Sequence, residues 1–414
     1  MLNEKKEREL AYIVTVDNVH PISGKDRVEC AVVGGWTCMV PKGAFKPGSA
    51  GIYFEIDSKL PEEERFAFTS RYGYKIKTQR FKTPEGPFYS QGLLMSPEDF
   101  GWTVQVEPLG GVRTEVVLDD EGKAHYPNDE SRFLTQKLGV TYAVTEDNKR
   151  KANSVDKYKK MVQRRQRLFS QKWARWMMRR DWGKKVMFFF FGRKKDKKNS
   201  WPAWVQKTDE ERVQNMPWIL NNKEPWIATE KIDGTSTTFT IKRRRFGKYD
   251  FFVCSRNVCF DKPDKNCFYE TNVYTEMAEK YDIENKMKEM MNTIFRDSEW
   301  LTIQGETYGA NIQKRDYSLK GHDFMAFNLI SPNTGRFNTL AMRQLLEETY
   351  EIPCVPVVDE KFILPDTIEE LLEYATNKSV VDGKEREGIV FRSQDGAQSF
   401  KAVSNEFLLK YHGG

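Results

Sequence analysis

A strongly basic segment divides this chain. Residues 149–200 contain 20 lysines and arginines and three aspartates, a net charge of +17, whereas the other residues contain 46 basic and 57 acidic side chains, a net charge of −11. A cationic block of this density favours a polyanion or an anionic membrane surface as its partner. We expect a folded unit on each side of it. The predicted boundaries are 1–130 for the first domain, 131–205 for a basic linker or insertion, and 206–414 for the last domain.

The basic segment has the pattern of an amphipathic helix. Val155, Tyr158, Val162, Phe169 and Trp173 fall largely at three- and four-residue steps, which predicts that the segment is partly helical. Interleaved tryptophan and arginine suit base stacking and phosphate contact. They equally suit a helix on an anionic membrane surface, or a connector whose aromatic side chains pack on a neighbouring domain.

The remaining composition excludes several classes of protein. No apolar run approaches the ~18–20 residues of a membrane-spanning helix, and the amino-terminal residues lack an apolar signal region. We therefore expect no transmembrane segment and a cytoplasmic, intracellular protein. Six cysteines in 414 residues are too few for a disulfide scaffold, and their spacing does not fit structural zinc. Buried thiols are the expected state.

Short strands separated by turns fill the first unit. Apolar and β-branched runs occur at 11–16, 29–35, 36–40 and 51–56, and we predict further strands at 72–82 and 90–95. Strands at roughly ten-residue spacing with glycine and proline turns indicate a small β-barrel of the OB type. Such a barrel commonly binds single strands, and a purely structural barrel fits the pattern as well.

The second unit alternates strand-like and helical patterns. Strands are predicted at 239–244, 251–255, 302–305, 324–329 and 388–392, and helices at 274–295, 339–350 and 367–375. The fold class expected for the chain is therefore α+β: a C-terminal domain of antiparallel sheets with flanking helices, preceded by the small β-barrel.

Four elements of the second unit carry chemical groups. Lys231 and Asp233 flank Ile232 in a K-I-D-G turn, Glu306 lies in a strand, Glu387 precedes an apolar strand, and Lys401 lies in the last strand. A lysine attacks an α-phosphorus only when its amine is unprotonated, which requires a pKa lowered by a cation or by desolvation. Carboxylates in this number suit a hydrated Mg²⁺. Each element alone is ordinary, but their order along the chain is informative.

Taken together, these elements resemble the covalent nucleotidyltransferase superfamily of ATP-dependent nucleic-acid ligases and mRNA capping enzymes. The resemblance implies that Lys231 accepts the nucleotide, that Lys401 meets the α-phosphate, and that Glu387 is the third catalytic residue. It further implies that Asp233, Glu306 and Glu387 hold the metal ion. The remaining nucleotide contacts that it implies come from Glu230, Arg256 in Ser255-Arg256-Asn257, Glu306, Phe327 stacked on the base, and Arg212.

The order of the domains indicates which members of this superfamily the chain resembles. Related DNA ligases and capping enzymes carry an OB domain after the last motif, but only residues 405–414 follow here. The barrel precedes the motifs, as in RNA ligases with an amino-terminal OB module. The chain departs from some of these ligases at Val403, where they have a second lysine two residues after the first. Phosphate charge is then expected to be met elsewhere, by Arg212 or Lys410.

The resemblance implies an activity. ATP donates AMP to Lys231 with loss of pyrophosphate, the AMP passes to an RNA 5′-phosphate, and a 3′-hydroxyl displaces it to seal the strand. ATP and Mg²⁺ are the implied cofactors, with Mn²⁺ as a substitute. RNA ends, at a nick in a duplex, are the implied partner, and RNA repair is the implied process. A DNA ligase, a guanylyltransferase and a non-catalytic RNA-binding protein remain the alternatives.

Overall fold

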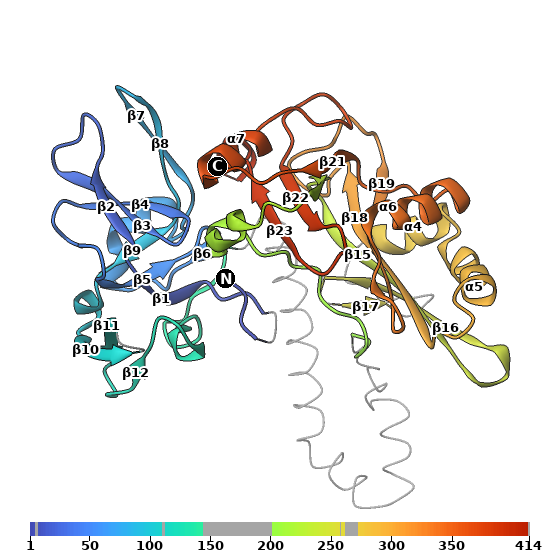
Figure 1. Cartoon of the computed structure of the whole chain (residues 1–414), viewed down its shortest axis with the longest axis horizontal. Helices are drawn as coiled ribbons and strands as arrows, with labels where there is room; N and C mark the ends of the chain where they lie inside the picture. Colours follow the sequence, from blue (N-terminus) through green and yellow to red (C-terminus); the bar gives the residue numbers. More distant parts are fainter. Residues whose placement is uncertain (5–6, 110–111, 144–200, 257, 261–271, 413–414) are drawn as a thin grey trace, which may run out of the picture.

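The computed structural model describes residues 1–4, 7–109, 112–143, 201–256, 258–260 and 272–412. The helix predicted in the basic segment lies outside these residues, as do Asn257 and Cys267. Figure 1 shows two bodies side by side, an N-terminal unit of small sheets and a larger C-terminal unit of two sheets with helices. Among the described strands, every pairing within the named sheets is antiparallel. The predicted α+β class with mostly antiparallel sheets is confirmed.

The N-terminal unit is built from five small sheets. Their strands, in spatial order, are β1 (Ala11–Thr15), β5 (Ala50–Phe54) and β9 (Leu93–Met95); β2 (Asn18–Pro21), β3 (Val28–Val33) and β4 (Trp36–Pro41); β7 (Gln79–Thr83) and β8 (Gly86–Ser90); β10 (Thr103–Leu109), β11 (Val112–Leu118) and β12 (Ala124–His125); and β13 (Thr141–Tyr142) and β6 (Ser58–Lys59). Because β13 pairs with β6, the packing of this unit continues beyond residue 130.

Strand β5 lies at the centre of this unit and is buried along its whole length. Successive side chains of a strand point to opposite faces, and here each face meets its own core. Ile52 and Phe54 pack in one cluster with Ile13 and Phe66, whereas Tyr53 packs in a second cluster on the other side.

The strand predicted over 72–82 forms only in its second half. A 3₁₀ segment, η1 (Glu64–Tyr72), occupies the start, and Gly73 and Tyr74 follow it with φ of +62° and +59°. Two successive left-handed residues turn the chain sharply and cannot continue a strand. Lys75 forms only an isolated bridge to Lys59, and the continuous strand begins at Gln79, where β7 meets β8.

The C-terminal unit contains two sheets. The first consists of β21 (Val357–Phe362), β14 (Trp226–Lys231), β22 (Gly388–Ser393) and β23 (Ser399–Val403), in that spatial order. The second consists of β17 (Cys259–Phe260), β16 (Tyr249–Ser255), β15 (Thr235–Arg243), β18 (Trp300–Gly309), β19 (His322–Ser331) and β20 (Gly335–Arg336). The five strands predicted in this unit lie in β15, β16, β18, β19 and β22.

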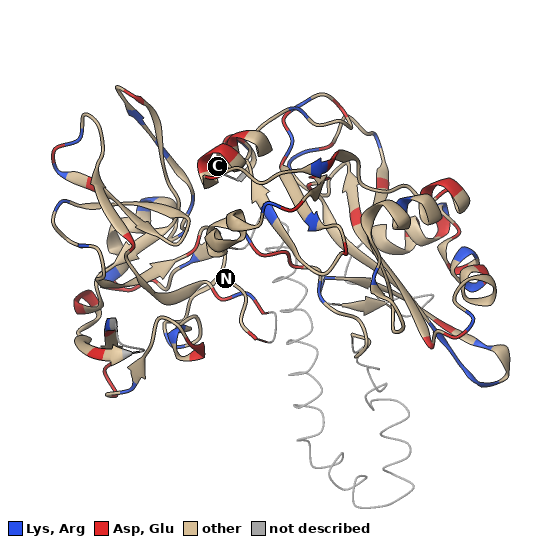
Figure 2. Cartoon of the chain, in the orientation of Figure 1, with Lys and Arg blue, Asp and Glu red and all other residues tan. Residues whose placement is uncertain are grey.

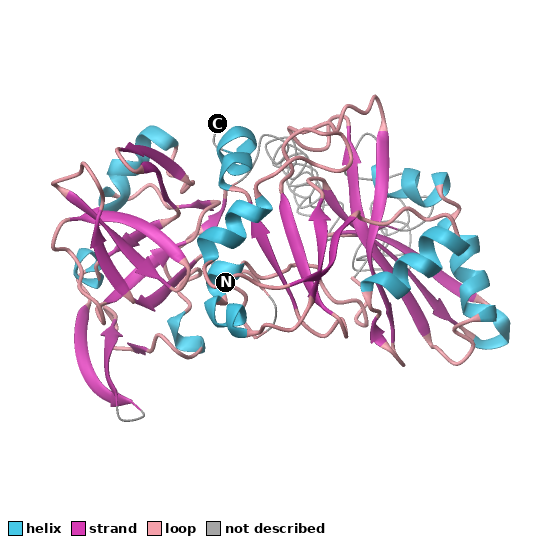
Figure 3. Ribbon diagram, turned by 45° about the horizontal axis from the view of Figure 1, so that its top comes forward, coloured by secondary structure: helices cyan, strands magenta, loops and turns pink. Residues whose placement is uncertain are grey.

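Helices cover the outer faces of these sheets (Figure 3). The helix predicted over 274–295 is divided into α4 (Val273–Lys280) and α5 (Ile283–Thr293), because Asp282 adopts φ +49° between them. That predicted over 339–350 forms α6 (Thr339–Arg343) and the π-helical η7 (Gln344–Thr349). The last, α7 (Ile368–Ala375), begins where the Thr367 hydroxyl caps it.

Buried side chains join the two units. Val403 of β23 and Leu408 pack in the same cluster as Tyr12, Trp36 and Tyr53 of the N-terminal unit. Among the described residues, no helix combines the length and apolar composition that a membrane crossing needs. The five cysteines in the described residues are buried and form no disulfide, as expected.

Candidate active site

The K-I-D-G turn connects the two sheets of the C-terminal unit. Lys231 is the last residue of β14, in the first sheet, and Thr235 is the first residue of β15, in the second. A Cβ at Gly234 would lie 2.3 Å from the Thr307 carbonyl oxygen, closer than real atoms approach. Glycine is therefore required for β15 to leave the turn against β18.

Lys231 and Glu387 meet at this junction. The Lys231 Nζ donates to Glu387 Oε2 at 2.7 Å. Strand pairing enforces the contact, since Lys231 lies opposite Gly388 and Glu387 precedes it. Gly388 also has a steric role, because a Cβ there would lie 2.2 Å from the Ala402 carbonyl oxygen. The side chains are only 24% and 11% exposed.

Two further carboxylates face the lysine. Asp233 is buried, and its backbone N–H donates to the Tyr317 hydroxyl at 2.7 Å. Burial and the charge of Glu387 raise the pKa of Asp233. Burial also raises the pKa of Glu306 to about 8, against the opposing effect of Lys231. The junction of the two sheets thus holds carboxylates that bind protons readily when no other cation is near.

The pKa of Lys231 is raised in the protein without a bound cation. Burial lowers its pKa, but Glu387, Glu306 and Asp233 outweigh burial and raise it above 10.5. The amine is therefore a charged ammonium in the free protein. A cation that neutralises the carboxylates would remove the cause of the raised pKa.

The carboxylate group fits a hydrated divalent cation. One oxygen of Asp233, Oδ2, is buried without a hydrogen-bond partner among the described residues. No three His, Cys, Asp or Glu side chains in the described ranges form a ready cage for an ion. A small hard cation that keeps several waters and takes the rest of its ligands from phosphates matches such a donor set.

The second lysine, Lys401, lies in β23, beside residues that contact the N-terminal unit. Burial, together with Arg8 and Arg212, lowers its pKa to about 7, and Asp209 opposes this effect. Arg212 runs beside it in a parallel bridge and lies 3.7 Å from Asp57 of the N-terminal unit. The concentration of positive charge at this point suits a phosphate.

Arg256 and Phe327 lie at the edges of the cleft. The guanidinium of Arg256 pairs with Asp209 and is 45% exposed. The ring of Phe327 is partly buried and packs with Ile232, the residue between Lys231 and Asp233. Both side chains have accessible surface near the junction of the sheets.

Glu230 does not join this group. It precedes Lys231 in β14 and therefore points to the opposite face of the sheet. Its carboxylate is buried and accepts hydrogen bonds from the Ser379 hydroxyl and from the Val380 N–H, the latter at 2.7 Å. These contacts anchor the loop that leads to Glu387, and contact with a nucleotide stays a prediction.

The substitution of valine at position 403 has a structural reason. Residues 401 and 403 share one face of β23, and Val403 is 2% exposed in the cluster that joins the two units. A lysine there would be buried among aromatic side chains. The Lys410 amine pairs with Glu385 at 2.8 Å on the surface, and its contact with a phosphate stays a prediction. Arg212 lies beside Lys401.

The sequence assigned no role to several further charged and polar residues. Asp209, whose charge acts on Lys401, Arg256 and Lys231, is one of them. Tyr317, which holds the K-I-D-G turn, is another. A third group consists of Lys75, Lys77 and Lys314. Burial lowers the pKa of Lys77, and the nearby charges of Lys75 and Lys314 lower it further. Their positions depend on distant segments meeting.

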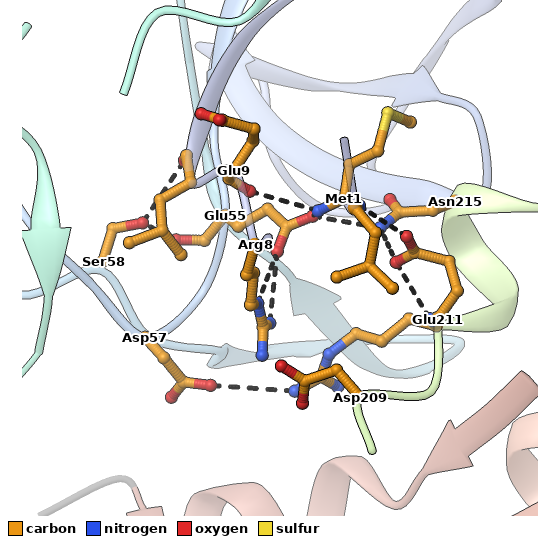
Figure 4. A network of polar contacts seen from close by, with 12 residues as sticks. Met1, Arg8, Glu9, Glu55, Asp57, Ser58, Asp209, Glu211 and Asn215 are labelled. Carbon is orange, nitrogen blue, oxygen red and sulfur yellow. Dashed lines mark hydrogen bonds and ion pairs between the residues drawn. The ribbon is translucent and has the colours of Figure 1, made fainter. Parts of the chain in front are cut away.

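A polar network fixes the N-terminal unit against the site (Figure 4). The carboxylate of Glu55 is fully buried, pairs with Arg8 at 3.1 Å and accepts from Asn215 Nδ2 at 3.0 Å. Asn215 also donates to Glu211 at 2.7 Å. The Glu211 carbonyl in turn accepts from the Lys401 N–H at 2.8 Å. A continuous set of hydrogen bonds therefore runs from the N-terminal core to Lys401.

Comparisons with known proteins agree with this geometry. Residues 224–412 match the RNA ligase family, and residues 10–96 match an OB-fold domain. No curated protein sequence matches the chain significantly.

Solved structures of a Naegleria gruberi RNA ligase are similar to the whole chain. A lysine-to-alanine variant with ATP and manganese has 26% identity and a TM-score of 0.66, over 98% of this chain and 99% of that one. An arginine-to-alanine variant with the same ligands has 26% identity and a TM-score of 0.67, over 98% and 100%. A form with pyrophosphate has 25% identity and a TM-score of 0.62, over 99% and 100%.

The RNA ligase match includes Lys231, Asp233, Glu306, Glu387 and Lys401. The chain belongs to the RNA ligase family, a family of ATP-dependent ligases, and carries an OB-fold domain ahead of its ligase domain.

Proposed function

We propose that this protein seals RNA ends through a lysyl-AMP intermediate on Lys231. The Lys231 amine attacks the α-phosphorus of ATP, a P–N bond forms, and pyrophosphate leaves with the electrons of the broken P–O bond. An RNA 5′-phosphate oxygen then attacks that phosphorus and releases the lysine. Finally the 3′-hydroxyl attacks the activated 5′-phosphate, AMP leaves, and a phosphodiester joins the strands, at a nick in a duplex during RNA repair.

The contact between Lys231 and Glu387, 2.7 Å in length, carries this proposal. Glu387, Glu306 and Asp233 would hold Mg²⁺ or Mn²⁺ through its water shell. The ion would supply positive charge at the phosphates. Because these carboxylates are the cause of the raised pKa of Lys231, their neutralisation favours loss of its proton and frees the amine for attack.

Cationic side chains meet the phosphate charge that develops in this step. Lys401 is placed to stabilise the α-phosphate, and an anion beside it would raise its lowered pKa, so that it binds as a charged ammonium. The cluster of Lys75, Lys77 and Lys314 suits the leaving pyrophosphate. Two of these lysines come from the N-terminal unit.

The nucleoside would be held at the edge of the cleft. We assign the adenine to the exposed part of the Phe327 ring, where a base can stack. We assign the ribose to Arg256, and further nucleotide contacts to Glu230 and Arg212. When the nucleotide binds, the Arg256 guanidinium would leave Asp209 and contact the ligand.

Covalent labelling tests the proposal. The purified protein, incubated with radiolabelled ATP and Mg²⁺, should retain label that mass spectrometry maps to Lys231. Lys231→Met should abolish the label, and Lys223→Met, which removes a surface lysine paired with Asp366, should keep it. Label retained by the Lys231 variant would refute the assignment. Glu387→Ala should slow labelling by ~10²-fold or more, the scale of lost transition-state electrostatics.

The same assay separates the alternatives. A guanylyltransferase would accept GTP in place of ATP. A DNA ligase would seal nicked duplexes with DNA 3′ ends at least as well as those with RNA 3′ ends. A non-catalytic RNA-binding protein would bind RNA without a covalent adduct. We expect labelling by ATP and a preference for RNA at the 3′ side of the nick.

A further inference from the structure

The loop between β15 and β16 presents an aromatic side chain flanked by cations. The Arg244 N–H donates to the Lys248 carbonyl at 2.7 Å and closes a loop of three residues, Arg245 to Gly247. Phe246 at its centre is 96% exposed. Arg245 and Lys248 are exposed as well. In Figure 2 this loop projects from the edge of the molecule remote from the N-terminal unit, with Lys and Arg along it.

The base of the loop is firmly held. Arg243 Nη2 donates to the Met291 carbonyl at 2.6 Å, and the Tyr249 hydroxyl donates to Asn292 Oδ1 at 2.5 Å. Lys242 pairs with Glu299 at 2.8 Å. These contacts fix both strands against the end of α5 and the residues that follow it. The tip is therefore presented on a rigid support.

The conformation of Phe246 is unfavourable for its residue type. Its φ and ψ are 62° and 34°, in the left-handed region. A bulky residue is rare there, whereas asparagine or glycine is tolerated. Because the Phe246 side chain is exposed, no burial of apolar surface offsets this unfavourable conformation. A strained and exposed residue of this kind is a candidate for a binding function.

We infer that this loop binds single-stranded RNA that extends beyond the nicked duplex. Phe246 would stack on an unpaired base, and Arg245 and Lys248 would contact the adjoining phosphates, as in proteins that bind single strands. The cations and the exposed ring complement a polyanion with accessible bases. A duplex fits less well, because its bases are already stacked. The inference rests on the proposed function, since RNA is the substrate there.

The geometry sets the length of RNA that the loop can reach. Strand β15 has nine residues between the K-I-D-G turn and the loop, which corresponds to about 30 Å at ~3.3 Å per residue. Only RNA long enough to span that distance from the reacting end would contact Phe246. A shorter RNA would occupy the cleft alone.

Binding of two RNAs to the full chain tests the inference. One 5′-phosphorylated single strand spans the distance and the other does not. Phe246→Asn should lower the affinity for the long RNA about five- to tenfold, the low end of the effect of removing an aromatic side chain that stacks on a base. The affinity for the short RNA should be unchanged. Phe246→Tyr should retain the affinity and Phe246→Leu should not. Trp218→Ala, which removes another exposed aromatic side chain, is the matched control and should have no effect.

Two further readouts separate stacking from charge and from folding. The double variant Arg245→Ser, Lys248→Ser should lower the slope of log affinity against log salt by about 1.4, at ~0.7 per phosphate contact of a single strand. Lys25→Ser with Lys361→Ser removes equal charge elsewhere and should not. Phe246→Asn should melt at the same or a higher temperature than the wild type, because asparagine tolerates the left-handed conformation.

Unchanged affinity for the long RNA in Phe246→Asn would overturn the inference, and it is the result expected if the loop instead docks on a protein or a membrane. An equal loss with both RNAs, or a loss that parallels a lower melting temperature, would overturn it as well. Labelling by ATP alone tests the proposed function separately. The loop variants should label normally, so a failure of one idea is not mistaken for a failure of the other.

Discussion

Replacement of Lys401 by methionine should stabilise the protein while it abolishes activity. The side chain is only 9% exposed, and burial, Arg8 and Arg212 lower its pKa from 10.5 to about 7. A fall of that size corresponds to about 5 kcal/mol at ~1.36 kcal/mol per pH unit. The free protein thus keeps a lysine in a place that disfavours its charged form.

The sign of the pH dependence follows from proton binding. Between about pH 7 and 10.5 the unfolded chain binds a proton at Lys401 and the folded chain does not, so the wild type gains stability as the pH rises. Below pH 7 both the folded and the unfolded chain hold the proton, so the full free-energy cost of burying the charged Lys401 remains. The variant has no such cost. The free energy of unfolding of the variant should exceed that of the wild type by about 5 kcal/mol at acidic to neutral pH, and by almost nothing near pH 10.5.

Urea unfolding of both proteins across this pH range measures the effect. Lys410→Met is the control, since its amine is exposed and pairs with Glu385, and it should not reproduce the stabilisation. A Lys401→Met protein that is less stable than the wild type at pH 7 would refute the reasoning. A stabilisation that does not shrink toward high pH would refute it equally.

The remaining predictions concern the interface and the metal site. Val403→Lys restores the second lysine of some RNA ligases, but it buries a cation in the cluster between the units. Urea unfolding should show that the free energy of unfolding falls by about 3 kcal/mol or more. Labelling by ATP should not increase. Because the pKa of Glu306 is about 8 and that of Asp233 is raised, Mn²⁺ should displace protons below pH 8, and its affinity should rise with pH and level off above 8. Calorimetry in buffers of different ionisation enthalpy measures the released protons, and binding without proton release would contradict the raised pKa values.

Local sequence patterns predicted much of the secondary structure. The alternation of apolar residues placed β15, β16, β18, β19 and β22, because burial of one strand face depends on residues two positions apart. The pattern failed where backbone conformation decides. Two left-handed residues, Gly73 and Tyr74, delay a predicted strand, and Asp282 divides a predicted helix, since side-chain polarity does not report φ.

The chemistry of the site was also visible in the sequence. Lys231, Asp233, Glu306 and Glu387 were predicted from motifs, and the structure brings them to one junction of two sheets. Strand pairing between β14 and β22 places Lys231 against Glu387, and the glycines of both motifs permit the close approach. These four residues were predicted because their motifs, in this order along the chain, resemble those of a known superfamily.

Only the tertiary structure decided the electrostatic state of these residues. The sequence analysis linked a lowered pKa at Lys231 to a neighbouring cation or to desolvation. Without a bound cation, the folded site raises the pKa of Lys231 and lowers that of Lys401. The difference arises because a pKa depends on burial and on charges from segments far apart in the chain, such as Arg8 and Asp209. The same holds for Val403, whose replacement of a lysine makes sense only against the aromatic side chains of the N-terminal unit. A sequence specifies which groups are present, but the distances between them, which set the interaction energies, exist only after the two units have packed together.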